Sequence, residues 1–180
     1  MRYFQKMKGS RLYLSPINKD DTEIYTKWLN DVEVSGNLGN YSKMISLNNE
    51  QQMLESMTSD GQHYAIVLYE NDTLIGNISL HQIDNIGRKA TTGLFIGEQE
   101  HRNKGYGSEA LKLILDFGFK ILNLHNIMLN VHSDNEMAIA CYKKVGFREF
   151  GRRRESSFKA GRYVDDVHME ILDTEFCQNK

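Results

Sequence analysis

The sequence predicts an α/β (α+β) protein in which helices cover one central mixed sheet. Strand patterns alternate with amphipathic helix patterns along most of the chain, and two apolar strands each lead directly into a helix. The chain has 180 residues, which is enough to bury one sizeable core, and it contains no internal repeat, low-complexity tract or linker. We therefore expect a single domain over residues 1–180, with its core between about residues 11 and 172.

The first half of the chain is predicted to hold three strands and two helices. Residues 11–17 alternate like a strand, and the only proline, Pro16, stands near its end. Asp20 or Asp21 can cap the helix that follows. The apolar face of this helix consists of Ile24, Tyr25, Trp28 and Leu29. Residues 31–45, rich in Gly, Asn and Ser, predict an irregular connection to a helix over about residues 47–57, and residues 63–69 and 73–84 predict a hairpin.

The second half is predicted to contain two strand–helix pairs and a closing hairpin. A strand over residues 88–97 leads through a glycine loop into a long helix, whose apolar face is expected to consist of Leu111, Ile114, Leu115, Ile121 and Leu122. A strand over residues 127–131 leads into a second helix, for which Ser133 and Glu136 have the spacing of a capping box and which Gly146 ends. Strands over residues 147–158 and 162–171 then form a hairpin around Ala160 and Gly161.

Composition excludes several classes of function. The net charge of −2 argues against general binding to nucleic acid or to an anionic membrane. No apolar run follows the charged N-terminus, so we expect neither a secretory signal nor a membrane anchor. The two cysteines, Cys141 and Cys177, fit a reducing cytoplasm, and Cys141 is expected to be a core residue rather than a nucleophile. The histidines and cysteines form no metal-ligand pattern, so no metal is expected.

The run Arg102-Asn103-Lys104-Gly105-Tyr106-Gly107 predicts a phosphate-binding loop. It lies between a strand and a long amphipathic helix. The two glycines let the backbone turn so that successive N–H groups converge at the positive end of the helix, and Arg102 and Lys104 add formal charge. The loop predicts a site for a pyrophosphate or a similar anion.

A second segment makes this prediction more specific. Residues 135–147 contain Asn135, Ala138, Tyr142, Lys144, Gly146 and Phe147, again between a strand and a helix. Together the two segments resemble motifs A and B of the GNAT acetyltransferase superfamily. The resemblance covers nearly the whole chain and is greatest to the RimJ/RimL-like branch, which includes ribosomal-protein N-terminal and spermidine/spermine acetyltransferases. It implies a mostly antiparallel sheet in which two parallel strands splay apart at an acyl-CoA site.

The resemblance also assigns residues to acetyl-CoA as the acyl donor. Backbone groups of two strand ends would hydrogen-bond the pantetheine arm, and Asn135 would contact the same arm. The expected cofactor-binding residues are Phe95, Ile96, Gly97, Arg102, Asn103, Lys104, Gly105, Tyr106, Gly107, Ser108 and Asn135. Tyr142 occupies the position of the family's general acid, so we expect it to protonate the departing CoA thiolate.

The general base is the position at which the chain departs from the family. In the stretch Ala90-Thr91-Thr92-Gly93 we interpret Thr92 as standing where many relatives carry a glutamate. A threonine hydroxyl orders water but accepts no proton at neutral pH. The other candidates for the base are Glu98, Glu100, His101 and His81.

The predicted function is transfer of the acetyl group of acetyl-CoA to a primary amine by direct attack in a ternary complex. The acceptor is a protein or peptide N-terminus or a small amine, and Asp31, Glu33, Tyr41 and Thr92 are the candidate acceptor-site residues. Without a carboxylate on the strand, an acceptor of lowered pKa, such as a peptide α-amine, is favoured. A polyamine acetyltransferase, an acyl-CoA-binding sensor or partner module, a scaffold that binds no CoA, and a homodimer all stay open.

Overall fold

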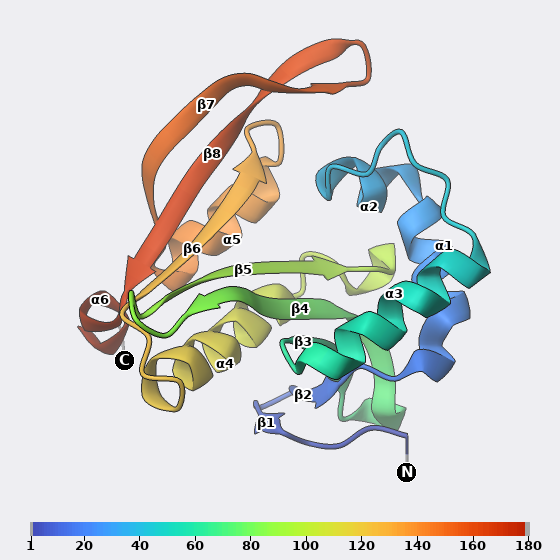
Figure 1. Ribbon diagram of the computed structural model, residues 1–180, viewed down its shortest axis with the longest axis horizontal. Helices are drawn as coiled ribbons and strands as arrows, with labels where there is room; N and C mark the ends of the chain where they lie inside the picture. Colours follow the sequence, from blue (N-terminus) through green and yellow to red (C-terminus); the bar gives the residue numbers. More distant parts are fainter. Residues whose placement is uncertain (1, 179–180) are drawn as a thin grey trace.

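An eight-stranded sheet organises the protein in the computed structural model, which describes residues 2–178. Its strand order is β1-β2-β3-β4-β5-β6-β8-β7, and helices pack on both faces (Figure 1). The strands are β1 (Met7–Lys8), β2 (Leu12–Pro16), β3 (His63–Leu68), β4 (Thr73–Asp84), β5 (Lys89–Ile96), β6 (Asn126–His132), β7 (Arg148–Lys159) and β8 (Arg162–Leu172). The helices are α1 (Thr22–Asn30), α2 (Val32–Asn37), α3 (Leu47–Asp60), α4 (Tyr106–Lys120), α5 (Glu136–Val145) and α6 (Asp173–Gln178), with short 3₁₀ turns η1 (Lys19–Asp21), η2 (Glu70–Asp72) and η3 (Gln99–His101). The predicted fold class is confirmed.

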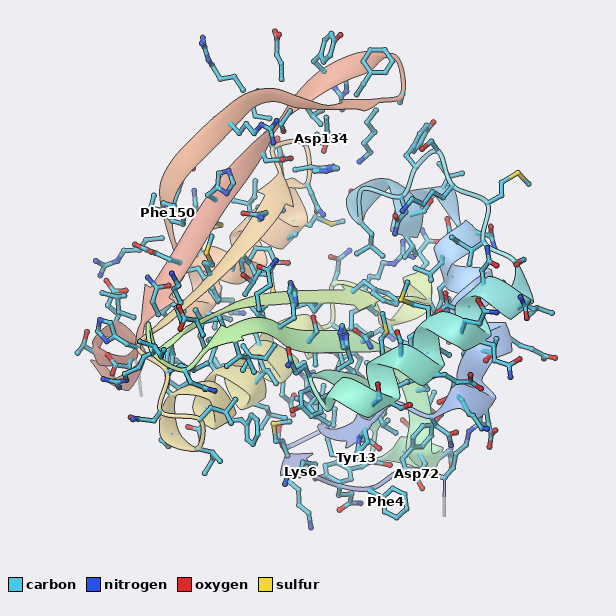
Figure 2. The ribbon with its side chains drawn as sticks, in the orientation of Figure 1. Phe4, Lys6, Tyr13, Asp72, Asp134 and Phe150 are labelled. Carbon is cyan, nitrogen blue, oxygen red and sulfur yellow. The ribbon has the colours of Figure 1, made fainter. Side chains whose placement is uncertain are left out.

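Strand alternation divides the interior into two cores, one on each face of the sheet. On β2, Leu12 and Leu14 pack into the core that α4, α5 and α6 cover, whereas Tyr13 packs into the core that α1 and α3 cover. Tyr13 also donates a hydrogen bond of 2.8 Å to Asp72 in the turn before β4 (Figure 2). Because alternate strand residues point to opposite faces, both faces of the sheet are apolar and both are covered by helices.

The sheet splays between β5 and β6. These two strands run parallel and pair only from Lys89 to Thr91, opposite Asn126 to Met128, whereas the other neighbouring strands are antiparallel. Beyond those three pairs β5 continues along β4, while β6 diverges with β8 and β7 (Figure 1). A V-shaped opening therefore separates the carboxyl-terminal ends of two parallel strands.

Three helix boundaries differ from the sequence prediction. Residues 31–45 are not wholly irregular, because the Asp31 side chain accepts a hydrogen bond from the Glu33 N–H and caps α2. Helix α3 runs to Asp60 and ends at Gly61, whose φ of 66° is the left-handed conformation of a C-cap. Helix α4 ends at Lys120, so Ile121 is 70% exposed and does not belong to the apolar face.

The predicted capping box of α5 is also wrong. Ser133 instead exchanges hydrogen bonds with Asp165 at the edge of β8. Asn135 caps the helix, because its Oδ1 accepts from the Ala138 N–H at 3.1 Å. Strand β1 and helix α6 were not predicted, because they are short and carry little periodic signal. In the described part of the chain no helix has the length and apolarity needed to cross a membrane.

Candidate functional site

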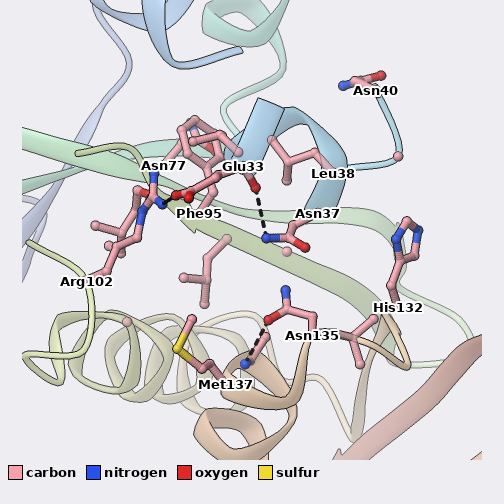
Figure 3. A pocket seen from close by; sticks show the side chains of 18 of the residues that line it. Glu33, Asn37, Leu38, Asn40, Asn77, Phe95, Arg102, His132, Asn135 and Met137 are labelled. Carbon is pink, nitrogen blue, oxygen red and sulfur yellow. Dashed lines mark hydrogen bonds and ion pairs between the residues drawn. The ribbon is translucent and has the colours of Figure 1, made fainter. Parts of the chain in front are cut away.

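A cavity of about 1360 Å³ opens where β5 and β6 diverge. Its walls come from β5 and the glycine loop, from the end of β6 and the start of α5, and from α2, α3, β3 and β4 (Figure 3). Of the predicted cofactor-binding residues, those that line it are Phe95, Ile96, Arg102, Asn103, Gly105, Tyr106, Gly107, Ser108 and Asn135. Most of the residues predicted from two separate motifs therefore lie around one cavity.

The glycine loop starts α4 with its backbone N–H groups at the cavity. Gly105 is the N-cap and has a φ of 81°, a conformation that glycine adopts without steric cost. No side chain caps this helix end, so the N–H groups of its first turn are available to an anion. This is the geometry that the sequence predicted for a phosphate-binding loop.

The loop is braced from the opposite side by the start of β2. Arg11 donates from Nη1 to the Lys104 carbonyl at 2.8 Å, and its guanidinium lies 4.7 Å from the centre of the Tyr106 ring. Glu109 accepts the N–H groups of Ser10 and Arg11 and also pairs with Arg11 Nε at 2.8 Å. Although burial opposes it, these hydrogen bonds lower the pKa of the Glu109 carboxyl. The loop conformation is thus fixed by residues that the motif does not include.

Three predicted binding residues have different roles in the structure. Arg102 does not direct its charge into the loop, because its guanidinium donates to the Ile96 and Gly97 carbonyls and to Glu33 Oε2. Gly97 does not line the cavity, and a Cβ there would lie 2.1 Å from the Trp28 ring. Lys104 also lies outside the cavity lining, and its backbone carbonyl receives the Arg11 hydrogen bond.

Two side chains of α5 reach the cavity from the other wall. Figure 3 shows Asn135 at the helix start, where its Oδ1 is used by the cap and its amide nitrogen points into the cavity. Tyr142, near the carboxyl-terminal end of α5, also lines the cavity, and burial raises the pKa of its phenol. Cys141, which was expected to be a core residue, packs against the core that α4, α5 and α6 cover and also lines the cavity, with its Sγ 3.1 Å from Ser108 Oγ.

Thr92 does not form part of the cavity. It is 2% exposed, and its hydroxyl donates to the Ser79 carbonyl at 2.8 Å. It stands opposite Leu80 on the sheet face that α4 covers. Thr92 was therefore the wrong residue to choose as an acceptor-site group, because alternation along β5 puts it on the far side of the sheet. In the Ala-Glu-x-Gly pattern of the relatives, the glutamate directly follows the alanine, so the matching residue here is Thr91 rather than Thr92. The Thr91 hydroxyl donates to Gln82 Oε1.

Of the four predicted candidates for the base, one lines the cavity and three do not. Glu98 lies outside the cavity, and hydrogen bonds from Lys27 and Trp28 lower the pKa of its carboxyl. Glu100 is also outside it and lies 3.3 Å from His101 Nε2. His101 lines the cavity, whereas His81 does not line it but has its Nδ1 3.0 Å from Ser79 Oγ.

The predicted acceptor-site residues are also divided. Glu33 and Tyr41 line the cavity, but Glu33 is paired with Arg102 at 2.8 Å. Asp31 does not line it, because its carboxylate caps α2 and lies 3.8 Å from the Arg102 guanidinium. Both carboxylates that were expected to hold a cation thus already face one.

The structure adds a group of polar residues that sequence reasoning missed. Glu50 on α3, His63 on β3, and Asn77 and Ser79 on β4 all line the cavity. A sequence signal for Glu50 was present, since it stands four residues before Leu54 and seven before Met57, on the stripe of α3 that faces inward.

Within residues 2–178 no three His, Cys, Asp or Glu side chains are arranged to hold a metal ion.

An open sheet with a helix N-terminus at the splay of two parallel strands offers backbone N–H groups to a phosphate-bearing ligand. Residues 11–148 match the family model described as the acetyltransferase (GNAT) domain. The chain therefore belongs to the GNAT acetyltransferase family, and it is an N-acetyltransferase that depends on acetyl-CoA.

Individual relatives agree with this family. An uncharacterized N-acetyltransferase, p20, from Bacillus licheniformis is 27% identical over 93% of this chain and 96% of that protein. Spermidine N(1)-acetyltransferase from Vibrio cholerae is 39% identical, over 57% of this chain and 59% of that enzyme. The crystal structure of the Vibrio cholerae spermidine N-acetyltransferase in complex with CoA and spermine has a TM-score of 0.83 and 28% identity, and covers 93% of this chain and 98% of that one.

Proposed function

We propose that the chain binds acetyl-CoA in the β5–β6 opening and transfers its acetyl group to a primary amine that enters from the side of α2 and α3. The observation that carries the proposal is the splay itself, since β5 and β6 stop pairing after Thr91 and Met128 and leave backbone groups of both strands free for a ligand. An amide-bearing arm needs such groups to satisfy its own donors and acceptors. The arm of CoA supplies two amides of this kind.

The pyrophosphate of CoA would then lie at the first turn of α4. Backbone N–H groups from Gly105 to Ser108 bind it there together with the positive end of the helix dipole. Asn135 offers its amide nitrogen to the pantetheine arm from the opposite wall. Acetyl-CoA is thus bound largely by backbone groups, while the charged side chains near α2 contact one another.

Tyr142 is the proposed proton donor to the CoA thiolate. Burial raises the pKa of the phenol, so it stays protonated until the thiolate forms. Because a thiol has a pKa of about 8.5, the thiolate is a good leaving group and needs only modest assistance. The reaction needs no covalent enzyme intermediate, since the amine attacks the thioester carbonyl directly.

The acceptor is proposed to be a small primary amine or a peptide N-terminus. The preference for an amine of lowered pKa rested on the absence of a carboxylate on the β5 strand. Glu50 on α3 brings a carboxylate to the cavity from another element, so the preference no longer distinguishes the acceptors. A polyamine is the second candidate, because two of the similar proteins act on spermidine or bind spermine. Against it, Asp31 and Glu33 face Arg102 and are not free to hold a second cationic group.

The test is release of the CoA thiol with acetyl-CoA and a panel of amines. The panel should contain a dipeptide with a free N-terminus, free lysine, spermidine and a simple monoamine, with mass spectrometry to locate the acetyl group. We expect thiol release that depends on at least one amine. Protein that binds CoA yet releases no thiol with any member would contradict the proposal.

A further inference from the structure

Glu50 is a buried carboxylate that the packing of the fold does not explain. It lies in the first turn of α3, is 4% exposed, and lines the cavity. None of the basic residues in the described chain forms an ion pair with it. Buried carboxylates without a cation are rare because the charged form loses its hydration, so an unpaired one in a cavity points to a cationic ligand.

Two further buried polar groups, on other elements, lie at the same cavity. Tyr25 on α1 is 2% exposed and Asn77 on β4 is 8% exposed, and both line the same cavity. The Tyr25 hydroxyl and the Asn77 amide nitrogen are buried and face each other, and a hydrogen bond from Asn77 acts on the Tyr25 phenol. Three elements, α1, α3 and β4, therefore each place a buried polar side chain at this part of the cavity, where the charge of Glu50 also acts on the Tyr25 phenol.

The register of the sheet puts these groups beside the opening. Asn77 pairs with Phe95 and Ser79 pairs with Gly93, so the polar side chains of β4 stand one strand away from the free edge of β5. If acetyl-CoA lies along that edge, as proposed above, its thioester approaches the cavity from one side. Glu50 then faces it from α3, on the side from which the acceptor enters.

We propose that Glu50 binds the ammonium group of the acceptor and takes its first proton. The nitrogen lone pair then forms the C–N bond to the thioester carbon, and the C–S bond breaks. The CoA thiolate takes a proton from the Tyr142 hydroxyl, and the second proton leaving the nitrogen restores that hydroxyl. The proton on Glu50 passes to solvent, so one proton is released for each ammonium acetylated. This inference rests on the proposed function.

The charge environment is consistent with such a role. Desolvation raises the pKa of the Glu50 carboxyl, which makes its anion a stronger base than an exposed carboxylate. Other titratable groups also line this side of the cavity: the Tyr25 phenol on α1, Tyr41 and Lys43 before α3, and His63 on β3. The His63 ring stacks on that of His81 on β4, with centroids 6.4 Å apart. A pH profile therefore has to distinguish Glu50 from the two histidines.

The test compares Glu50→Gln with Glu55→Gln, an exposed glutamate one turn further along α3. With the best amine of the panel, Glu50→Gln should lower kcat/KM by about 10²- to 10⁴-fold, the range that general bases contribute. Glu50→Asp should recover part of the loss, whereas Glu55→Gln should match wild type. The affinity for acetyl-CoA should stay the same in all three variants.

Stability and pH provide readouts that a structural role would not produce. A carboxylate with a raised folded-state pKa destabilises the fold as pH rises through that pKa, so Glu50→Gln should melt at pH 8 no lower than wild type. The residual activity of Glu50→Gln should rise with pH through the pKa of the free amine. In the pH profile of kcat/KM, His63→Asn should keep the same fall on the acidic side (the acid limb) as wild type.

The outcomes separate the two proposals. Full kcat/KM in Glu50→Gln, or an acid limb that moves in His63→Asn instead, would overturn the role of Glu50 and leave the proposed function in place. Wild-type protein that binds CoA but acetylates no amine would overturn both. Loss of activity in Glu50→Gln together with a lower melting temperature and weaker acetyl-CoA binding would assign Glu50 to structure.

Discussion

Arg102 Nη1 lies 2.8 Å from Glu33 Oε2, and the same guanidinium donates hydrogen bonds to the carbonyls of Ile96 and Gly97. One side chain thus connects the end of β5, the glycine loop and α2. Figure 3 shows Arg102 and Glu33 meeting at one side of the cavity. The loop that would bind the acyl donor and the helix that borders the acceptor side are therefore positioned by a common contact.

This contact predicts unequal effects of its two partners on stability. The Glu33 side chain is 66% exposed, so Glu33→Gln should change the free energy of unfolding by less than about 1 kcal/mol. Arg102→Ala leaves two carbonyls without their donor and should cost about 2 to 3 kcal/mol. Urea unfolding of both variants measures the difference. Equal losses would show that the ion pair, rather than the carbonyl contacts, holds the junction.

Gly105→Asp should abolish CoA binding. The substitution adds a Cβ at a φ of 81° and a negative charge at the start of α4. CoA at about 100 times its Kd stabilises wild type by roughly 2.7 kcal/mol, which a thermal-shift measurement detects. Gly161→Asp is the matched control, since Gly161 has the same φ of 81° in the β7–β8 turn with no atom within 4 Å of an added Cβ. A CoA-induced shift that survives in Gly105→Asp would exclude the loop as the phosphate site.

Tyr142→Phe should lower kcat by about 10²-fold or more while acetyl-CoA affinity is retained. Only the hydroxyl is removed, and the ring can still pack against Phe147, whose centroid is 5.9 Å away. Tyr163→Phe, at a tyrosine that is 64% exposed on β8, is the control and should be neutral. Steady-state and single-turnover kinetics together provide the measurement. If single-turnover rates are unchanged in Tyr142→Phe, the tyrosine has no role in the chemical step.

Glu109→Gln should destabilise the protein in a pH-dependent way. The folded-state pKa of Glu109 is lowered, so its contribution is present above the unfolded pKa of about 4.3 and is lost as pH falls through the lower folded value. We expect a loss of roughly 2 kcal/mol at pH 7, the scale of hydrogen bonds to a charged group, and a smaller loss at pH 3. Denaturant unfolding at the two pH values tests this. A difference that is the same at both would mean that the charge of Glu109 contributes nothing.

The sequence alone was sufficient wherever local physics fixes the result. Gly105 fits the turn that starts α4, because glycine adopts positive φ without steric cost, whereas Gly107 lies within the helix. The period-2 strands and amphipathic helices likewise predict a helix-covered sheet, because each apolar face has to be buried. The positions of Asn135 and Tyr142 at one cavity follow from the same local pattern.

Tertiary structure decided where the side chains point and which of them have partners. Arg102 looked like a phosphate ligand, but its long flexible side chain bonds to carbonyls and to a carboxylate brought near by α2, a helix with little periodic signal. Thr92 was chosen by position in a motif, yet a shift of one residue along a strand moves a side chain to the opposite face. The burial of Glu50 depends on how α1, α3 and β4 meet, which are long-range contacts that no local pattern specifies. The sequence therefore determined the backbone frame of the proposed donor site, whereas packing between distant elements determined the charges on the proposed acceptor side.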